Sequence, residues 1–92
     1  MRLPNDVTTD AIAQTIMQRL DERATDASIC PSEVARALAP DNWRPLMPQV
    51  RAVAAEMANA GTLRITQGSV EIAPKAVLRG EIRGPLRLRR CW

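Results

Sequence analysis

The apolar residues of this chain change their spacing at Gly61. Before Gly61 they recur every three or four residues in separate stretches, which is the period of an amphipathic helix. After it, Leu63 and Ile65, and then Val70 and Ile72, alternate with polar residues, as strands do. The sequence therefore predicts an α+β fold of three helices followed by a small antiparallel β-hairpin.

Start and stop signals set the bounds of these elements. We predict helices from Thr8 or Thr9 to about Ala24, from Pro31 to Ala39 and from Leu46 to just before Gly61, with a short extended step from Ser28 to Cys30. Threonine is a good N-cap, proline suits the first helical turn, and glycine often ends a helix. Gly68 and Ser69 supply the two-residue turn of the hairpin.

The tail after the hairpin combines leucines and arginines in alternation. Leu86 and Leu88 share one parity, and Arg83, Arg87 and Arg89 share the other. An extended segment would place the leucines on the core and the arginines in a row outside. We therefore expect residues 75–92 to form an extended basic strap that packs on the rest of the chain.

The predicted order of helix, short strand, helix, turn, helix and hairpin is that of a winged helix-turn-helix domain. In this architecture the first helix packs behind the other two, the short strand joins the edge of the hairpin, and the hairpin is the wing. We expect a flexible N-terminus over residues 1–7, a winged-helix domain over residues 8–74 and the C-terminal strap over residues 75–92.

Four motifs strengthen this interpretation. They are ICPSEVAR from Ile29, WRPLMPQVR from Trp43, ITQ from Ile65 and RGPLRLR from Arg83. Together they resemble a family of small bacterial winged-helix proteins of unknown function, over about residues 8–90. The resemblance implies a fold and a bacterial origin, and it implies no activity.

Length and composition restrict the function classes. With 92 residues the chain is long enough for one small domain, and its longest apolar run is far shorter than the ~20 residues of a membrane span. The first ten residues lack the layout of a signal peptide, so we expect a cytoplasmic protein. Cys30 and Cys91 are then expected to be free thiols.

Catalysis is not expected. The chain has no histidine, which is the usual general base and metal ligand near neutral pH. Cys30, at the start of a predicted helix, is the one candidate nucleophile, but its neighbours are apolar and the sequence places no base beside it. We therefore predict a protein that is not an enzyme, with no cofactor and no metal.

Charge favours a nucleic-acid partner. From Thr62 onward there are seven basic residues and two acidic ones, and all but one of the chain's 13 basic residues are arginine. The candidate contacts are Arg44, Gln49, Arg51, Asn59, Arg64, Arg83, Arg87 and Arg89. Only Gln49, Arg51 and Asn59 on the third helix could read bases, so we predict phosphate contacts to duplex DNA with little base readout.

This prediction requires the arginines to converge on one cationic surface once the chain is folded. The alternative is that they are neutralised one by one by acidic neighbours such as Glu71, Glu81, Asp41 and the carboxylates at the end of the first helix.

A protein-interaction module is the competing class. Small and apolar residues are predicted on the outer face of the third helix, namely Met47, Pro48, Ala52, Ala55 and Ala58. They would let a second copy of the chain or another protein approach closely. The alternative is that the chain's own tail folds over this face.

The two tryptophans have different expected roles. Trp43 lies between two turns and is predicted to fill the junction of the second and third helices, so that its replacement by alanine should cost about 3 kcal/mol or more. Trp92 is predicted to be loose or to anchor a partner.

Overall fold

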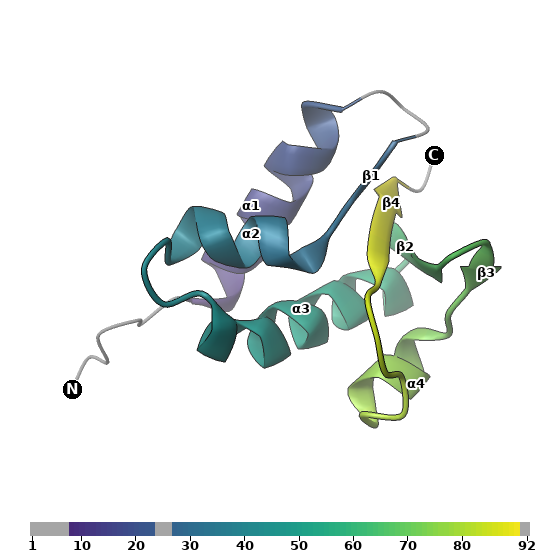
Figure 1. The fold of residues 1–92 in the computed structure, drawn as a ribbon. Coiled ribbons are helices and arrows are strands. Elements are labelled where there is room, and N and C mark those ends of the chain that lie inside the picture. Colours follow the sequence, from purple (N-terminus) through teal and green to yellow (C-terminus); the bar gives the residue numbers. More distant parts are fainter. Residues whose placement is uncertain (1–7, 24–26, 91–92) are drawn as a thin grey trace.

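The structure, a computed structural model, describes residues 8–23 and 27–90. Within them the chain is an α+β fold of four α-helices, one 3-10 helix and a four-stranded antiparallel sheet (Figure 1). In chain order the elements are α1 (Thr9–Asp21), β1 (Ser28–Ile29), α2 (Pro31–Leu38), the 3-10 helix η1 (Arg44–Leu46), α3 (Met47–Asn59), β2 (Leu63–Gln67), β3 (Val70–Glu71), α4 (Pro74–Leu78) and β4 (Arg87–Arg90). The expectations for residues 1–7, Cys91 and Trp92 lie outside the described residues.

The cap and apolar stripe of α1 agree with the sequence analysis. Thr8 is its N-cap, and the Thr8 hydroxyl oxygen accepts a hydrogen bond from the Ala11 amide at 3.1 Å. Ile12, Ile16 and Leu20, one on each successive turn, are fully buried. This stripe attaches α1 to α2 and α3.

The predicted hairpin is also present. Thr66 of β2 lies opposite Glu71 of β3, and Gln67 lies opposite Val70. Gly68 is the first of the two turn residues and has a φ of +62°, as a type II′ turn requires. Glycine adopts this backbone conformation without strain.

β4 takes the place in the sheet that we expected for β1. The strand order is β1-β4-β2-β3, and Leu88 of β4 lies opposite Ile29 of β1 and Ile65 of β2. The prediction that the short strand joins the edge of the β2–β3 hairpin is therefore wrong. Leu88, Ile29 and Ile65 are all buried, so these three residues form an apolar row across β1, β4 and β2, with Leu88 at its centre.

The C-terminal tail is not one extended strap. Pro74–Leu78 form a helix, and in the described part of the tail only Arg87–Arg90 extend as a strand. Pro74 is the first residue of α4, where a missing N–H costs no helical hydrogen bond. The predicted alternation holds in β4 itself, where Leu88 is buried and Arg87 is exposed.

α4 packs on α3 and changes which residues of α3 are exposed. Ala55, which we expected on an open outer face, is completely buried. Ala52 and Ala58 are half-buried and Pro48 is exposed. The prediction that Ala55 belongs to an exposed interface is therefore wrong, because α3 is enclosed by α4 as well as by α1, α2 and β2.

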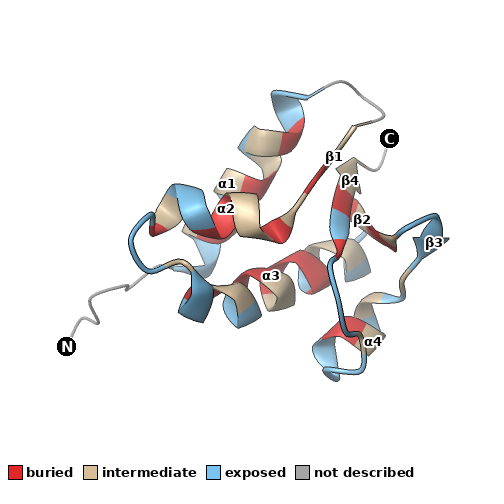
Figure 2. Cartoon of the chain, viewed as in Figure 1, coloured by how far each residue is buried: buried red, intermediate tan, exposed pale blue. Residues whose placement is uncertain are grey.

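One apolar core joins the helices to the inner face of the sheet. Figure 2 shows buried residues in α1, α2 and α3 and in β1, β2 and β4, whereas β3 is exposed. No helix in the described part of the chain has the length and apolar character of a membrane span.

Candidate nucleic-acid interface

Strand register defines the two faces of the sheet. Residues directly opposite each other in an antiparallel ladder share a face, and successive residues in a strand alternate between faces. Ile29, Leu88 and Ile65 lie opposite one another and are buried against the helices. Their neighbours in β1, β4 and β2 therefore belong to the outer face.

Three arginines lie on this outer face. Arg89 of β4 lies opposite Arg64 of β2, and Arg87 of β4 lies opposite Thr66. We call Arg64, Arg87 and Arg89 the sheet arginines. Glu71 of β3, which lies opposite Thr66, is the one acidic residue in the four strands. The outer face thus has three guanidinium groups and one carboxylate.

Hydroxyl groups of neighbouring strands orient two of the sheet arginines. Arg87 donates from Nε to Ser28 Oγ at 2.8 Å and from a terminal nitrogen to the Ser28 carbonyl oxygen at 3.1 Å. Arg89 donates from Nε to Thr66 Oγ1 at 3.2 Å. These bonds connect β4 to both of its neighbours, so each guanidinium is fixed across the sheet. A fixed guanidinium loses little entropy when it binds an anion.

Arg64 has a different environment. A terminal nitrogen of Arg64 lies 3.5 Å from a carboxylate oxygen of Glu71, and both side chains are well exposed. The Nε atom of Arg64 is buried and has no hydrogen-bond partner among the described residues. Exposed ion pairs of this kind contribute little, whereas an unsatisfied buried donor is destabilising. The ion pair with Glu71 and the unpartnered Nε therefore have opposite effects on stability at Arg64.

Neutralisation by acidic neighbours occurs at other arginines as well. Arg90 pairs with Asp21 of α1 at 3.1 Å, and Arg79 lies 3.9 Å from Glu81. The alternative that we raised from the sequence therefore applies to part of the basic set, with Glu71, Glu81 and the end of α1 as the acids.

Arg44 and Arg51 do not join the sheet arginines in one surface. Arg44 is in η1, which precedes α3, whereas β2 follows α3, and a helix of 13 residues is about 20 Å long. Arg51 donates to the Ile82 carbonyl oxygen at 3.2 Å. Arg83 is exposed between α4 and β4, and Gln49 and Asn59 are exposed on α3. Of the predicted residues, Arg64, Arg87 and Arg89 are cross-strand neighbours. Gln67 of β2 donates to the Arg83 carbonyl oxygen at 2.6 Å, so the backbone at Arg83 lies next to the sheet.

Arg44 belongs to a second cationic group, around Trp43. The guanidinium carbons of Arg36 and Arg44 lie 4.4 Å and 4.8 Å from the centroid of the Trp43 ring, within the range of cation–π attraction. Trp43 is half-buried and packs against the core. Sequence analysis did not identify Arg36, since no local signal links the last turn of a helix to a ring seven residues later.

Cys30 lies at the start of a helix, close to a polar hydroxyl group. It is the N-cap of α2, it is half-buried, and its sulfur accepts a hydrogen bond from the Ser32 hydroxyl at 3.1 Å. Arg19, Glu33 and Arg36 line a shallow hollow beside it. Within residues 8–23 and 27–90, no three cysteine or carboxylate side chains are grouped so that they could hold a metal.

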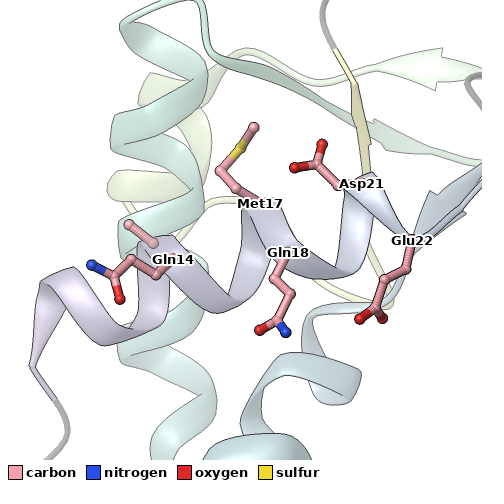
Figure 3. Close-up of a pocket in the computed structure, with 6 residues that line it drawn as sticks. Gln14, Met17, Gln18, Asp21 and Glu22 are labelled. Atoms are coloured by element: carbon pink, nitrogen blue, oxygen red, sulfur yellow. The ribbon is translucent and has the colours of Figure 1, made fainter.

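A second hollow runs along α1. Figure 3 shows its lining residues, with Met17 and Asp21 pointing to one side of the helix and Gln18 and Glu22 to the other. All of the lining residues come from α1 and its C-cap, Glu22. A hollow with no second wall does not enclose a ligand, so we assign no site to it.

Comparison with known proteins gives a family and no activity. Among curated proteins no match was found. The model of a family described as "Protein of unknown function (DUF3253)" matches residues 9–91, which is most of the chain. The chain is therefore a member of this family of unknown function, DUF3253.

Proposed function

We propose that this chain is a non-enzymatic, cytoplasmic winged helix-turn-helix module that binds duplex nucleic acid through phosphate contacts. The strand order supports the winged-helix assignment if β4, rather than β3, is the second strand of the wing. β2 and β4 then form the long hairpin, and β1 pairs with its edge at β4, as the architecture requires.

In this assignment the wing is the whole connection between β2 and β4. Residues 68–86 contain the tight turn, β3, α4 and the loop that leads to β4. The Gly68-Ser69 turn is only the first turn of this connection.

The reading helix of such a domain would be α3, and it is poorly suited to base readout here. α4 packs on it and Ala55 is completely buried. Arg51, one of its three candidate base readers, donates to the Ile82 carbonyl oxygen instead. We therefore assign binding to the outer face of the sheet and not to α3.

The observation that carries the proposal is the grouping of the sheet arginines. Planar guanidinium groups bind phosphate oxygens in a bidentate manner. Arg64, Arg87 and Arg89 come from two adjacent strands, and Ser28 and Thr66 orient two of them.

A duplex is favoured over a single strand. Proteins that bind single strands on a sheet stack the bases on aromatic side chains. No aromatic residue lies in the four strands, and Trp43, between α2 and η1, is the one aromatic residue in the described part of the chain. The sheet face offers charge without a stacking platform, which suits the backbone of a duplex.

A fluorescence-anisotropy titration with a short labelled DNA duplex tests the proposal. Three phosphate contacts predict that log affinity falls against log salt with a slope of about −2.7 between roughly 50 and 200 mM. Replacing Arg87 and Arg89 by glutamine should reduce the magnitude of the slope by about 2.

The matched control is Arg79→Gln. Arg79 is well exposed, lies outside the sheet and is paired with Glu81. Its replacement removes one charge and should leave the sheet contacts intact. Absence of duplex binding at low salt, or equal losses for Arg79→Gln and Arg87→Gln, would contradict the proposal.

Protein interaction remains the second candidate function, and one observation favours it. Met47, Pro48 and Ala52 of the predicted interface line a groove between α3 on one side and α4 with the loop after it on the other. Ala55 is completely buried, whereas Pro48 and Leu78 of the groove lining are exposed.

A further inference from the structure

The groove between α3 and α4 is built from two separate parts of the chain. Met47, Arg51 and Ala52 come from α3, and Leu78 and Ile82 come from α4 and the loop after it. The groove therefore has two walls, unlike the hollow along α1.

The surface of this groove is largely apolar. Leu78 is 47% exposed, which is unusual for a large apolar side chain in the described part of this molecule. Met47 and Ile82 are half-buried, and Ala52 adds a small side chain to the lining. A partner side chain inserted here would bury apolar area of its own and of these residues, which is the main driving force for such contacts.

Arg51 supplies a fixed charge in the same lining. One of its terminal nitrogens donates to the Ile82 carbonyl oxygen at 3.2 Å. A guanidinium has five N–H groups, so this bond occupies one of them and orients the rest. An oriented guanidinium beside an apolar surface suits a carboxylate that follows an apolar side chain.

Residues next to the lining add positive charge. Arg79 lies between Leu78 and Gly80, and Arg83 directly follows Ile82. Glu81 is the one acidic residue in this stretch, and it lies 3.9 Å from Arg79. Arg51 belongs to the lining, and Arg79 and Arg83 are adjacent in the sequence to lining residues, against one acidic residue, Glu81. This excess of positive charge along the segment favours an acidic occupant.

We propose that this groove binds a segment of a partner protein in which an apolar side chain is flanked by acidic residues. The apolar side chain lies among Met47, Ala52 and Leu78, and a carboxylate pairs with Arg51. This inference rests on the second of the two functions proposed above and is independent of nucleic-acid binding by the sheet arginines.

The test is selection from a random peptide display library on the immobilised wild-type chain. The Ala52→Glu variant serves as the counter-selection, because its added carboxylate fills the groove and repels an acidic segment. Enriched peptides are then synthesised and titrated by anisotropy. We expect them to combine a leucine, isoleucine, methionine or phenylalanine with aspartate or glutamate neighbours.

Point variants locate the contacts. Arg51→Gln and Leu78→Glu should each weaken the enriched peptides by about tenfold or more, which corresponds to one lost charged or apolar contact. Leu78 is exposed enough that its replacement should not unfold the chain. Arg64→Gln, on the sheet, should leave peptide binding unchanged while it weakens duplex binding. The failure of one proposed function can therefore be distinguished from the failure of the other.

Three results would overturn the inference. These are the lack of any peptide that prefers wild type to Ala52→Glu, the enrichment of basic or uncharged peptides, and the formation of a homodimer that Ala52→Glu dissociates. The last result would assign the groove to a second copy of the chain.

Discussion

At the scale of single residues, a sequence pattern can predict where a side chain lies without predicting which side chains surround it. Trp43 is at the predicted junction, but its ring is half-buried, with Arg36 and Arg44 close to it. The sequence indicated a large ring beside two turns. It could not indicate that two guanidinium groups, rather than aliphatic side chains, would cover part of that ring.

Replacing Trp43 by alanine should lower the free energy of unfolding by about 2 kcal/mol. This is less than the 3 to 5 kcal/mol of a fully buried tryptophan, since part of the ring is already exposed. Urea denaturation followed by circular dichroism measures the loss. Trp43→Phe, which keeps a ring for both arginines, should lose clearly less; equal losses would mean that the ring contacts contribute nothing.

Replacing Arg64 by methionine should leave stability unchanged or raise it by up to about 1 kcal/mol. The change removes a buried Nε donor that has no partner and loses only an exposed ion pair with Glu71. Arg87→Met is the comparison, because it breaks two hydrogen bonds to Ser28 and should be destabilising. A loss above 1 kcal/mol for Arg64→Met would show that the Glu71 pair stabilises the fold.

Elements were predictable where their signals are local. The first three helices and the hairpin have caps, stripes or turn residues within a few positions of one another. Local alternation indicated that β4 is extended, but its place in the sheet has no local signal, because its partners Ile29 and Ile65 are 59 and 23 residues away from Leu88 in the sequence. α4 has only five residues, which is too short for a helical period to be recognised.

The position of β4 predicts a large effect of its central leucine. Leu88→Ala should lower the free energy of unfolding by about 3 kcal/mol, because it leaves a cavity between Ile29 and Ile65. Leu78→Ala removes the same atoms from an exposed position and should lose less than about 1 kcal/mol. Similar losses in chemical denaturation would show that β4 does not lie in the centre of the sheet.

At the scale of the whole molecule, the candidate site was predictable in part. Alternation in the tail indicated that Arg87 and Arg89 face outward, and the hairpin placed Arg64 on a strand. Their meeting depends on the register between β2 and β4, which the sequence pattern does not contain. The same missing information led us to expect that Arg44 would join them.

The central position of β4 also predicts which fragments of the chain can fold by themselves. If residues 8–74 were a domain and the remainder a strap, residues 8–74 would fold alone. In the structure they lack β4, so β1 loses the partner strand with which it is paired and Ile65 loses its neighbour Leu88. The fragment also lacks most of α4, which packs on α3.

We therefore expect residues 8–74 to show no cooperative thermal unfolding and poor dispersion of amide resonances, whereas residues 8–90 unfold in one transition. Circular dichroism and two-dimensional NMR on the two fragments make the comparison. Adding residues 75–90 to the fragment as a separate peptide should restore part of the cooperative unfolding and of the amide dispersion. β4 pairs with β1 and β2 through backbone hydrogen bonds, which need no covalent connection. A fragment of residues 8–74 that unfolds cooperatively by itself would mean that β4 is an accessory to the fold.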